Sequence, residues 1–197
     1  MSLLLETIKI WNGVALNLPL HLKRMARARK ELFGMADDAG LEHLLTLPPG
    51  VHEEIVRCRV IYDTEIREIG FIPYVPALVR SLHIVHANHL DYAHKYLDRD
   101  ALNALVDKAK ADDVLIVKNG WVTDCTIANL VFTDGEKNYT PSTPLLRGTQ
   151  RDLLIQKGII EETEIRVEDI ARFTHFKLVN ALLEFDGEWL ETGRVLV

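Results

Sequence analysis

The sequence predicts an α+β fold in which strand hairpins alternate with helices. Three two-residue turn signals, Asn12-Gly13, Asn119-Gly120 and Asp134-Gly135, each lie between stretches rich in β-branched and aromatic residues, which is typical of tight hairpins. Segments with helical spacing of apolar residues separate the hairpins, so the pattern favours α+β over a doubly wound parallel sheet. The length of 197 residues suits one large domain or two small ones.

The first half opens with a predicted hairpin from Leu3 to Leu18. Pro19 suits a first helical turn and Gly34 is a stop signal, so the helical spacing between them predicts a helix over residues 19–33. The elements expected next are a short helix and loop over 37–49, strands over 54–63, 66–72 and 81–86, and a crossover into the second half over 87–98.

The second half continues the same mixture of elements. Helices are expected over 100–111 and 149–157, the second of them opened by Gly148. The second and third turn signals predict hairpins over 114–122 and 131–139. Residues 140–144 contain two prolines and are expected to form a loop. The last predicted strands cover residues 163–167, 175–179 and 182–185.

Composition and charge exclude several classes of protein. A hydrophobic fraction of 48% with 26% charged residues is ordinary for a globular protein and excludes a disordered or collagen-like chain. The net charge of −6 disfavours a nucleic-acid partner. No apolar run reaches about 18 residues and no targeting signal is evident, so we expect a soluble protein with no membrane partner. Cys58 and Cys125 are expected to be core thiols in a reducing cytoplasm.

Single residues give weak signals for chemistry. Four histidines, at positions 83, 86, 89 and 94, crowd one region, but His83 and His86 would face opposite sides of a strand and no carboxylate completes a ligand set, so no metal is expected. Taken alone, Arg24 on a helix and Lys95 in a loop-like stretch are most simply solvated side chains. Gly148 before a helix can present N–H groups to a phosphate, although glycine there is commonly just a cap.

Several motifs in order resemble those of the class IV aminotransferases, which are fold type IV pyridoxal-phosphate enzymes. The resemblance extends over nearly the whole chain and is strongest over Val122–Phe132. Its motifs are Leu5-Glu6-Thr7-Ile8, His21-Leu22-Lys23-Arg24-Met25, Lys95 followed by Leu102, Val122–Phe132, Thr140-Pro141 and Leu146–Arg151. The family implies a fold like that of D-amino-acid aminotransferase, with two small α+β domains, residues 1–85 and 86–197, and the cofactor in the cleft between them. It also implies a homodimer.

The resemblance gives roles to individual residues. Lys95 would form the Schiff base with pyridoxal 5'-phosphate and act as general base at the substrate α-carbon. Arg24 and the backbone amides of Thr149 and Gln150 would hold the phosphate, in agreement with the helix dipole.

Two further positions complete the implied cofactor site. Asn180 and Ala181 fall where the family has another phosphate-contacting turn. Asp124 stands where the family usually has the glutamate that faces the pyridine nitrogen and keeps it protonated. Because aspartate is one methylene shorter, the cofactor would sit deeper or a water would bridge the gap. The chain is also short for the family, so substrate-determining loops would be missing or supplied by a second subunit.

Within the family, the sequence looks closest to 4-amino-4-deoxychorismate lyase, which releases 4-aminobenzoate and pyruvate. The segments that favour this branch are residues 119–124 and 180–182. Transamination of a branched-chain or D-amino acid is the alternative, and a relative that binds the cofactor without catalysis is the third interpretation. The substrate would be a small amino compound. Arg57, Arg59 and Arg80 are available as carboxylate ligands, but surface or ion-pair roles are the simpler expectation for each.

Overall fold

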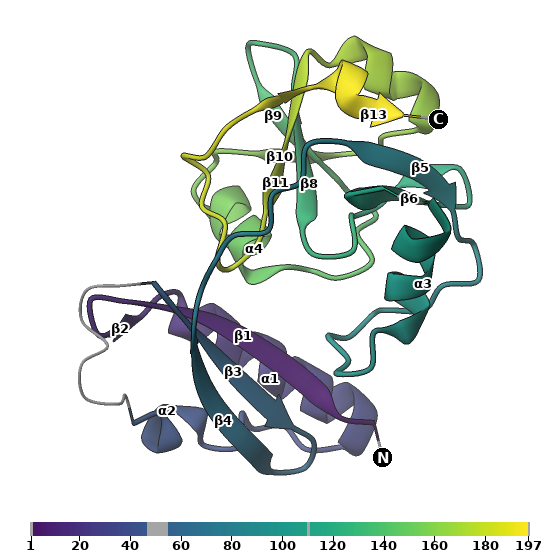
Figure 1. Cartoon of the computed structure of the whole chain (residues 1–197). Helices are drawn as coiled ribbons and strands as arrows, with labels where there is room; N and C mark the ends of the chain where they lie inside the picture. Colours follow the sequence, from purple (N-terminus) through teal and green to yellow (C-terminus); the bar gives the residue numbers. More distant parts are fainter. Residues whose placement is uncertain (1, 47–54, 110, 197) are drawn as a thin grey trace. The chain divides into compact units, whose positions relative to one another are not determined.

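The structure is a computed structural model that describes residues 2–46, 55–109 and 111–196 (Figure 1). The chain divides into two compact units, one made of residues up to Pro76 together with His94–Asp98, the other of Ala77–Ala93 and Arg99 onward. Residues 77–85, which we expected in the first domain, are thus grouped with the second unit, and Lys95 is grouped with the first. Helices and strands mixed in several sheets confirm the α+β class.

The first unit is built on an antiparallel sheet of order β2-β1-β3-β4. Its strands are β1 (Leu4–Trp11), β2 (Val14–Ala15), β3 (Val56–Tyr62) and β4 (Ile66–Pro73), and its helices are α1 (Leu18–Phe33) and α2 (Leu41–Leu44). Asn12 and Gly13 take φ values of 48° and 74°, so the first predicted hairpin and its turn are confirmed. Gly34, with φ of 74°, ends α1 as predicted.

Helix α1 packs against one face of this sheet. Along β1 the side chains alternate, so Leu4, Ile8 and Ile10 are buried in one core with Met25 and Ala28 of α1. The residues between them, Leu5, Thr7 and Lys9, lie on the opposite face of the sheet because successive side chains of a strand point to opposite sides.

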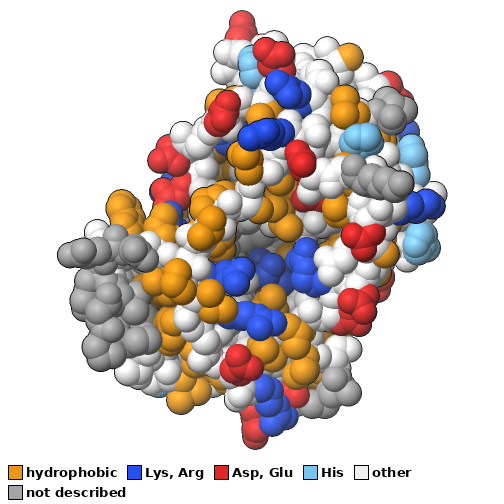
Figure 2. Space-filling view, viewed as in Figure 1, with side chains coloured by type: hydrophobic (Ala, Val, Ile, Leu, Met, Phe, Trp, Pro, Cys, Tyr) orange, Lys and Arg blue, Asp and Glu red, His pale blue; other side chains and the backbone are white. Residues whose placement is uncertain are grey.

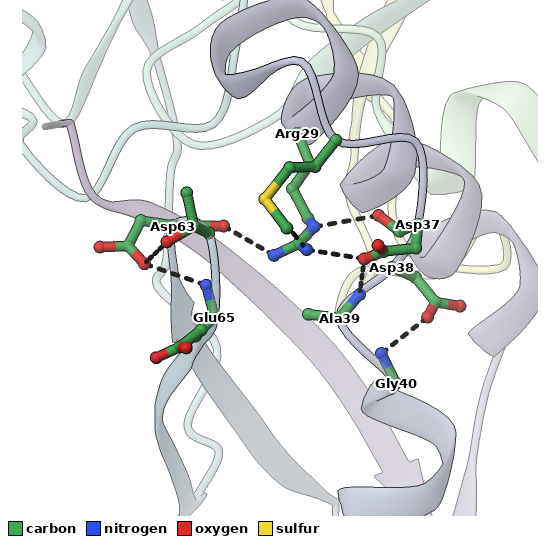
Figure 3. A network of polar contacts seen from close by, with 9 residues as sticks. Arg29, Asp37, Asp38, Ala39, Gly40, Asp63 and Glu65 are labelled. Carbon is green, nitrogen blue, oxygen red and sulfur yellow. Dashed lines mark hydrogen bonds and ion pairs between the residues drawn. The ribbon is translucent and has the colours of Figure 1, made fainter.

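A fully buried arginine ties α1 to two loops of the first unit (Figure 3). Arg29 donates from Nε to the carbonyl of Asp37 at 3.0 Å, from Nη1 to the carbonyl of Asp63 at 2.9 Å, and from Nη2 to Asp37 Oδ1 at 2.6 Å. The same Oδ1 accepts the N–H of Ala39 at 2.9 Å. These acceptors compensate the burial of the guanidinium, which holds the end of α1 against the β3–β4 turn.

The second unit contains two sheets that share a core. One has the order β13-β5-β6-β7, from β5 (Leu82–His86), β6 (Asp113–Lys118), β7 (Trp121–Val122) and β13 (Val195–Leu196). The other has the order β10-β9-β8-β11-β12, from β8 (Asn129–Thr133), β9 (Asn138–Pro141), β10 (Glu161–Thr163), β11 (His175–Val179) and β12 (Leu190–Glu191). Its helices are α3 (Asp100–Ala109), α4 (Thr149–Gln156), η1 (Val167–Arg172) and η2 (Thr192–Arg194).

Most elements predicted for this unit are confirmed, and three predictions were wrong. Thr140 and Pro141 belong to β9 rather than to a loop, because β9 gains a parallel partner in β10. The strand expected over 163–167 lies over 161–163 instead, and a 3₁₀ helix begins at Val167. Residues 182–185 form no strand, because Asn180 Oδ1 accepts the N–H groups of the second and third residues after it and so holds a turn.

The remaining sequence predictions concern residues outside the described ranges, the two cysteines, membrane-spanning helices and metal sites. Residues 47–49, 54 and 110 of the predicted elements lie outside the described residues. Cys58 and Cys125 are buried free thiols, as expected. Within the described ranges, no helix is long and apolar enough to cross a membrane, and no group of three His, Cys, Asp or Glu side chains could hold a metal ion.

Candidate active site

A buried carboxylate organises the polar residues of the first unit. Glu6 lies on the α1 side of β1 and is fully buried. Its Oε2 accepts hydrogen bonds from His21 Nδ1 and Arg24 Nη2, both at 2.6 Å, and its Oε1 accepts one from Arg24 Nε at 2.8 Å. His21 and Arg24 are three residues apart on α1, which puts both side chains on the same face of that helix.

The charges of this cluster are fixed by its own contacts. Burial alone would raise the pKa of Glu6, but the Arg24 guanidinium and the His21 ring outweigh it and lower that pKa to about 2. Burial lowers the pKa of His21, so this imidazole is neutral near pH 7. Burial and the nearby Glu6 charge raise the pKa of the Tyr62 hydroxyl. The result is an anchored, permanently charged guanidinium beside a neutral ring.

Lys95 lies next to this cluster. Its carbonyl accepts the N–H of Leu5 at 2.8 Å, and Leu97 donates to the carbonyl of Leu3 at 2.9 Å, so this short segment extends along the start of β1. The positive charge of Lys95 contributes, after burial, to lowering the pKa of His21. The structure therefore gathers Lys95 and Arg24, two of the predicted site residues, around one histidine of the first unit.

Asp124 is the central group among the predicted site residues of the second unit. It lies between β7 and β8 and is 4% exposed. Its Oδ1 accepts a hydrogen bond from Asn129 Nδ2 at 2.7 Å, and its Oδ2 accepts the N–H of Leu146 at 2.9 Å. Burial raises the pKa of Asp124 to about 7 although both hydrogen bonds oppose the shift. Asn129 also donates to the carbonyl of Leu146 at 2.8 Å, so it holds the loop before α4.

The start of α4 depends on a close approach that only glycine allows. A Cβ atom on Gly148, the residue before the helix, would lie 2.0 Å from Asn129 Oδ1. Gly148 provides no side-chain cap, and Thr149 and Gln150 form the buried first turn. Backbone N–H groups and the helix dipole make such a turn favourable for an anion.

Asn180 and Ala181 occupy the turn that follows β11. Besides holding this turn, Asn180 donates from Nδ2 to the carbonyl of Ile127 at 3.1 Å. Ile127 belongs to the segment between Asp124 and Asn129, so the two loops are tied together. The second unit thus brings Asp124 and Asn180 onto connected loops, and Thr149 and Gln150 follow the loop that Asn129 holds.

Sequence reasoning assigned no role to Glu6, His21 or Asn129, although all three lie in the quoted motifs. A signal for Glu6 existed, because a carboxylate alternating with Leu4 and Ile8 occupies a core position of a strand. Of the three arginines considered earlier, Arg57 and Arg59 lie on β3, whereas Arg80 lies in the second unit and donates its N–H to Asp112 Oδ2 at 3.0 Å.

Comparison with known families decides the classification of this arrangement. Residues 3–185 match the family model described as amino-transferase class IV. The chain belongs to this family. A relative of unassigned function from Haemophilus influenzae is 40% identical over 182 residues, which are 91% of this chain and 97% of the relative.

Two solved structures share the class IV fold. One, from Haemophilus somnus 129PT, is provisionally named a 4-amino-4-deoxychorismate lyase; it is 30% identical, with a TM-score of 0.80 over 94% of this chain and 98% of that one. The other is a hypothetical aminotransferase from Mycobacterium tuberculosis in its pyridoxal-phosphate-bound form; it is 20% identical, with a TM-score of 0.75 over 100% of this chain and 83% of that one. At 20% identity, the similarity to the second structure shows that the two chains share a fold.

Class IV aminotransferases depend on pyridoxal phosphate, and the residues of this chain fit that group. The cofactor needs a primary amine, a cationic or helix-terminal phosphate site and a carboxylate near its ring nitrogen. Lys95 would provide the amine, Arg24 and the start of α4 would each suit a phosphate, and Asp124 is a buried carboxylate whose hydrogen bonds come from neutral donors.

Proposed function

We propose that this class IV chain is a pyridoxal-phosphate-dependent lyase that releases 4-aminobenzoate and pyruvate from 4-amino-4-deoxychorismate. The observation that carries the proposal is the similarity to the Haemophilus somnus protein provisionally named for that activity, which is 30% identical over nearly the full length of both chains. The match covers 94% of this chain and 98% of that one. Residues 119–124 and 180–182, whose sequence resembles the lyase branch of the family, also support the proposal.

Each residue of the site would have a defined task. The bound cofactor supplies an electron-withdrawing ring that stabilises negative charge at the substrate carbon bearing the amine. Lys95 would hold the cofactor covalently and then move a proton at that carbon through Nζ. Arg24, oriented by Glu6, and the first turn of α4 would bind the phosphate. Asp124 would face the ring nitrogen, and a positive charge placed there favours its ionised form.

Transamination of an amino acid is the second candidate, because the family model is named for it. Both reactions begin with removal of a proton from the substrate carbon that bears the amine, so Lys95 would serve either of them. An amino donor alone would convert the cofactor of a transaminase to its amine form. The lyase instead returns the cofactor unchanged after each turnover, so the two candidates differ in a directly observable product.

The deciding experiment mixes 4-amino-4-deoxychorismate with the purified, pyridoxal-phosphate-saturated protein and measures 4-aminobenzoate, pyruvate and the visible spectrum together. Multiple turnovers would support the lyase. A visible lysine-bound cofactor band without product, which an amino donor then converts to the amine form, would favour the transaminase, and a band that no amine changes would favour a binding protein without catalysis. Lys95→Ala should lose both the band and turnover, whereas Lys157→Ala, at an exposed lysine after α4, should keep both.

We also propose, from the family, that the protein is a homodimer located in the cytoplasm. Light scattering of the purified protein tests the dimer, and a mass equal to a single 22.4 kDa chain would contradict it. The location can be tested by cell fractionation with the chain detected by antibody.

A further inference from the structure

One face of the sheet in the first unit carries three positively charged side chains on two neighbouring strands. Lys9 lies on the β1 face that points away from α1, and the register of β1 with β3 places Arg57 directly opposite Lys9 and Arg59 directly opposite Thr7. Side chains of directly opposite residues leave the same face with Cβ atoms about 5 Å apart. Figure 2 shows Lys and Arg side chains among hydrophobic ones on this side of β1, β3 and β4.

The two arginines are not neutralised by the strands around them. Like charges directly opposite one another destabilise a sheet. Among the described residues, neither Arg57 nor Arg59 forms an ion pair, and Arg57 Nε is buried without a hydrogen-bond partner. Glu68 of β4 shares the face, where it lies opposite Ile61, but it is outside ion-pair distance of both arginines. Within the described residues the two guanidinium groups thus have no ion-pair partner, and an anion bound over this face would compensate them.

Apolar surface accompanies the cations on the same face. Trp11 follows Lys9 two residues along β1 and is 47% exposed, and Ile72 of β4 lies opposite Arg57 and is 40% exposed. Gly70 lies opposite Arg59 and brings no side chain, and the Glu68 carboxylate borders this part of the face, with Oε1 3.7 Å from where a Gly70 Cβ would be. Guanidinium groups bordered by apolar side chains are suited to a small molecule that combines a ring with carboxylates.

We propose that Arg57 and Arg59, assisted by Lys9, bind the carboxylates of the substrate, and that the amino substrate is therefore a ring-bearing dicarboxylate. The inference deepens the proposed function and rests on it, since 4-amino-4-deoxychorismate carries two carboxylates. Two guanidinium groups on alternate positions of β3, about 7 Å apart along the strand, match two carboxylates of one molecule. An amino acid with one carboxylate would leave one of them unmatched.

The test uses chorismate as the probe, because it keeps both carboxylates but has a hydroxyl in place of the amine and so cannot bond to the cofactor. Calorimetry on the pyridoxal-phosphate-loaded protein should show chorismate binding about tenfold or more weaker in Arg57→Gln and in Arg59→Gln. Binding of 4-hydroxybenzoate, which has a single carboxylate, should be weak in the wild type. Lys23→Gln removes one charge from an exposed position of α1 and should leave chorismate binding within twofold.

The same variants separate failure of this inference from failure of the proposed function. If lyase turnover occurs, the arginine variants should raise KM for the amino substrate and change kcat little, with an unchanged visible band. Turnover with unchanged KM would overturn the inference and leave the lyase intact. Arginine-dependent chorismate binding without turnover would support the dicarboxylate site and remove the lyase.

Folding and charge effects are controlled separately. Arg57→Lys and Arg59→Lys keep the charge and should recover part of the affinity, which a purely structural role of the arginines would not produce. Absence of chorismate binding to the wild type, or equal loss in Lys23→Gln, would overturn the proposal.

Discussion

In the cofactor-free protein, ionisation of the buried Asp124 carboxyl lowers the free energy of unfolding as pH rises, and Asp124→Asn should remove this pH dependence. The wild-type carboxyl is 4% exposed, and burial raises its pKa from 3.8 to about 7 against the hydrogen bonds from Leu146 and Asn129. Between about pH 4 and pH 7 the folded protein thus keeps the proton that the unfolded chain has lost. The free energy of unfolding of the wild type therefore falls as pH rises through this window and levels off above it.

The size of the effect follows from the shift. Each unit of pKa difference corresponds to about 1.4 kcal/mol, so the part of the shift that lies between pH 4.5 and pH 7 gives about 3 kcal/mol. The amide side chain introduced by Asp124→Asn is neutral at every pH and lacks this dependence. The unfolding free energy of the wild type minus that of Asp124→Asn should therefore decrease by about 3 kcal/mol from pH 4.5 to pH 7.5, as an upper value.

Urea unfolding of both proteins at a series of pH values measures this difference, with tryptophan fluorescence in a Trp11→Phe background so that the signal comes from the second unit. Subtraction cancels the contributions of other groups. Asp134→Asn is the matched control: the Lys137 and Glu136 N–H groups lower the pKa of this exposed carboxyl, so its difference should be small and of opposite sign. A difference for Asp124→Asn that stays constant with pH would refute the reasoning.

Three further substitutions test the packing around the site. Gly148→Ala would place a Cβ 2.0 Å from Asn129 Oδ1 and should destabilise the protein by about 1–3 kcal/mol in thermal unfolding, whereas Gly193→Ala, with no atom within 4 Å, should have little effect. Arg29→Met should cost about 1–3 kcal/mol in urea unfolding, because it leaves the buried carbonyl of Asp63 without this donor and removes the contacts with the more exposed Asp37. Glu6→Gln should weaken pyridoxal-phosphate binding about tenfold with little change in kcat at saturation, since it loosens the guanidinium that it orients; unchanged affinity would show that Glu6 has no positioning role.

The elements that the sequence predicted well are those with strong local causes. Asn12 and Asn119 both take positive φ values before a glycine, which is the turn that the dipeptides require. Gly34 and Gly148 mark the end of α1 and the start of α4 as expected. Each of these features depends on the conformational preferences of two or three neighbouring residues, so no distant contact is needed to establish it.

The wrong predictions depend on partners distant in the sequence or on a side chain that competes with the backbone. Thr140 and Pro141 lie in a proline-rich stretch, and only the parallel pairing with β10, about twenty residues later, makes them a strand. Residues 182–185 have strand-like composition, but the Asn180 side chain takes the N–H groups that a strand would use. The motifs indicated Lys95 and Arg24, whereas the role of Glu6 became visible only when β1 and α1 were packed together.

The chain buries two carboxylates, Glu6 in the first unit and Asp124 in the second, in opposite charge states, and this contrast indicates what each is for. Glu6 has its counter-ion inside the protein, since Arg24 binds both oxygens and lowers the pKa to about 2. Asp124 accepts its hydrogen bonds from neutral groups, and its pKa of about 7 reflects burial that these bonds do not offset. A carboxylate buried in this way becomes favourable once a positive charge lies beside it. If a protonated ring nitrogen of pyridoxal phosphate is that charge, loading the cofactor should lower the pKa of Asp124 and abolish most of the pH-dependent stability difference between the wild type and Asp124→Asn.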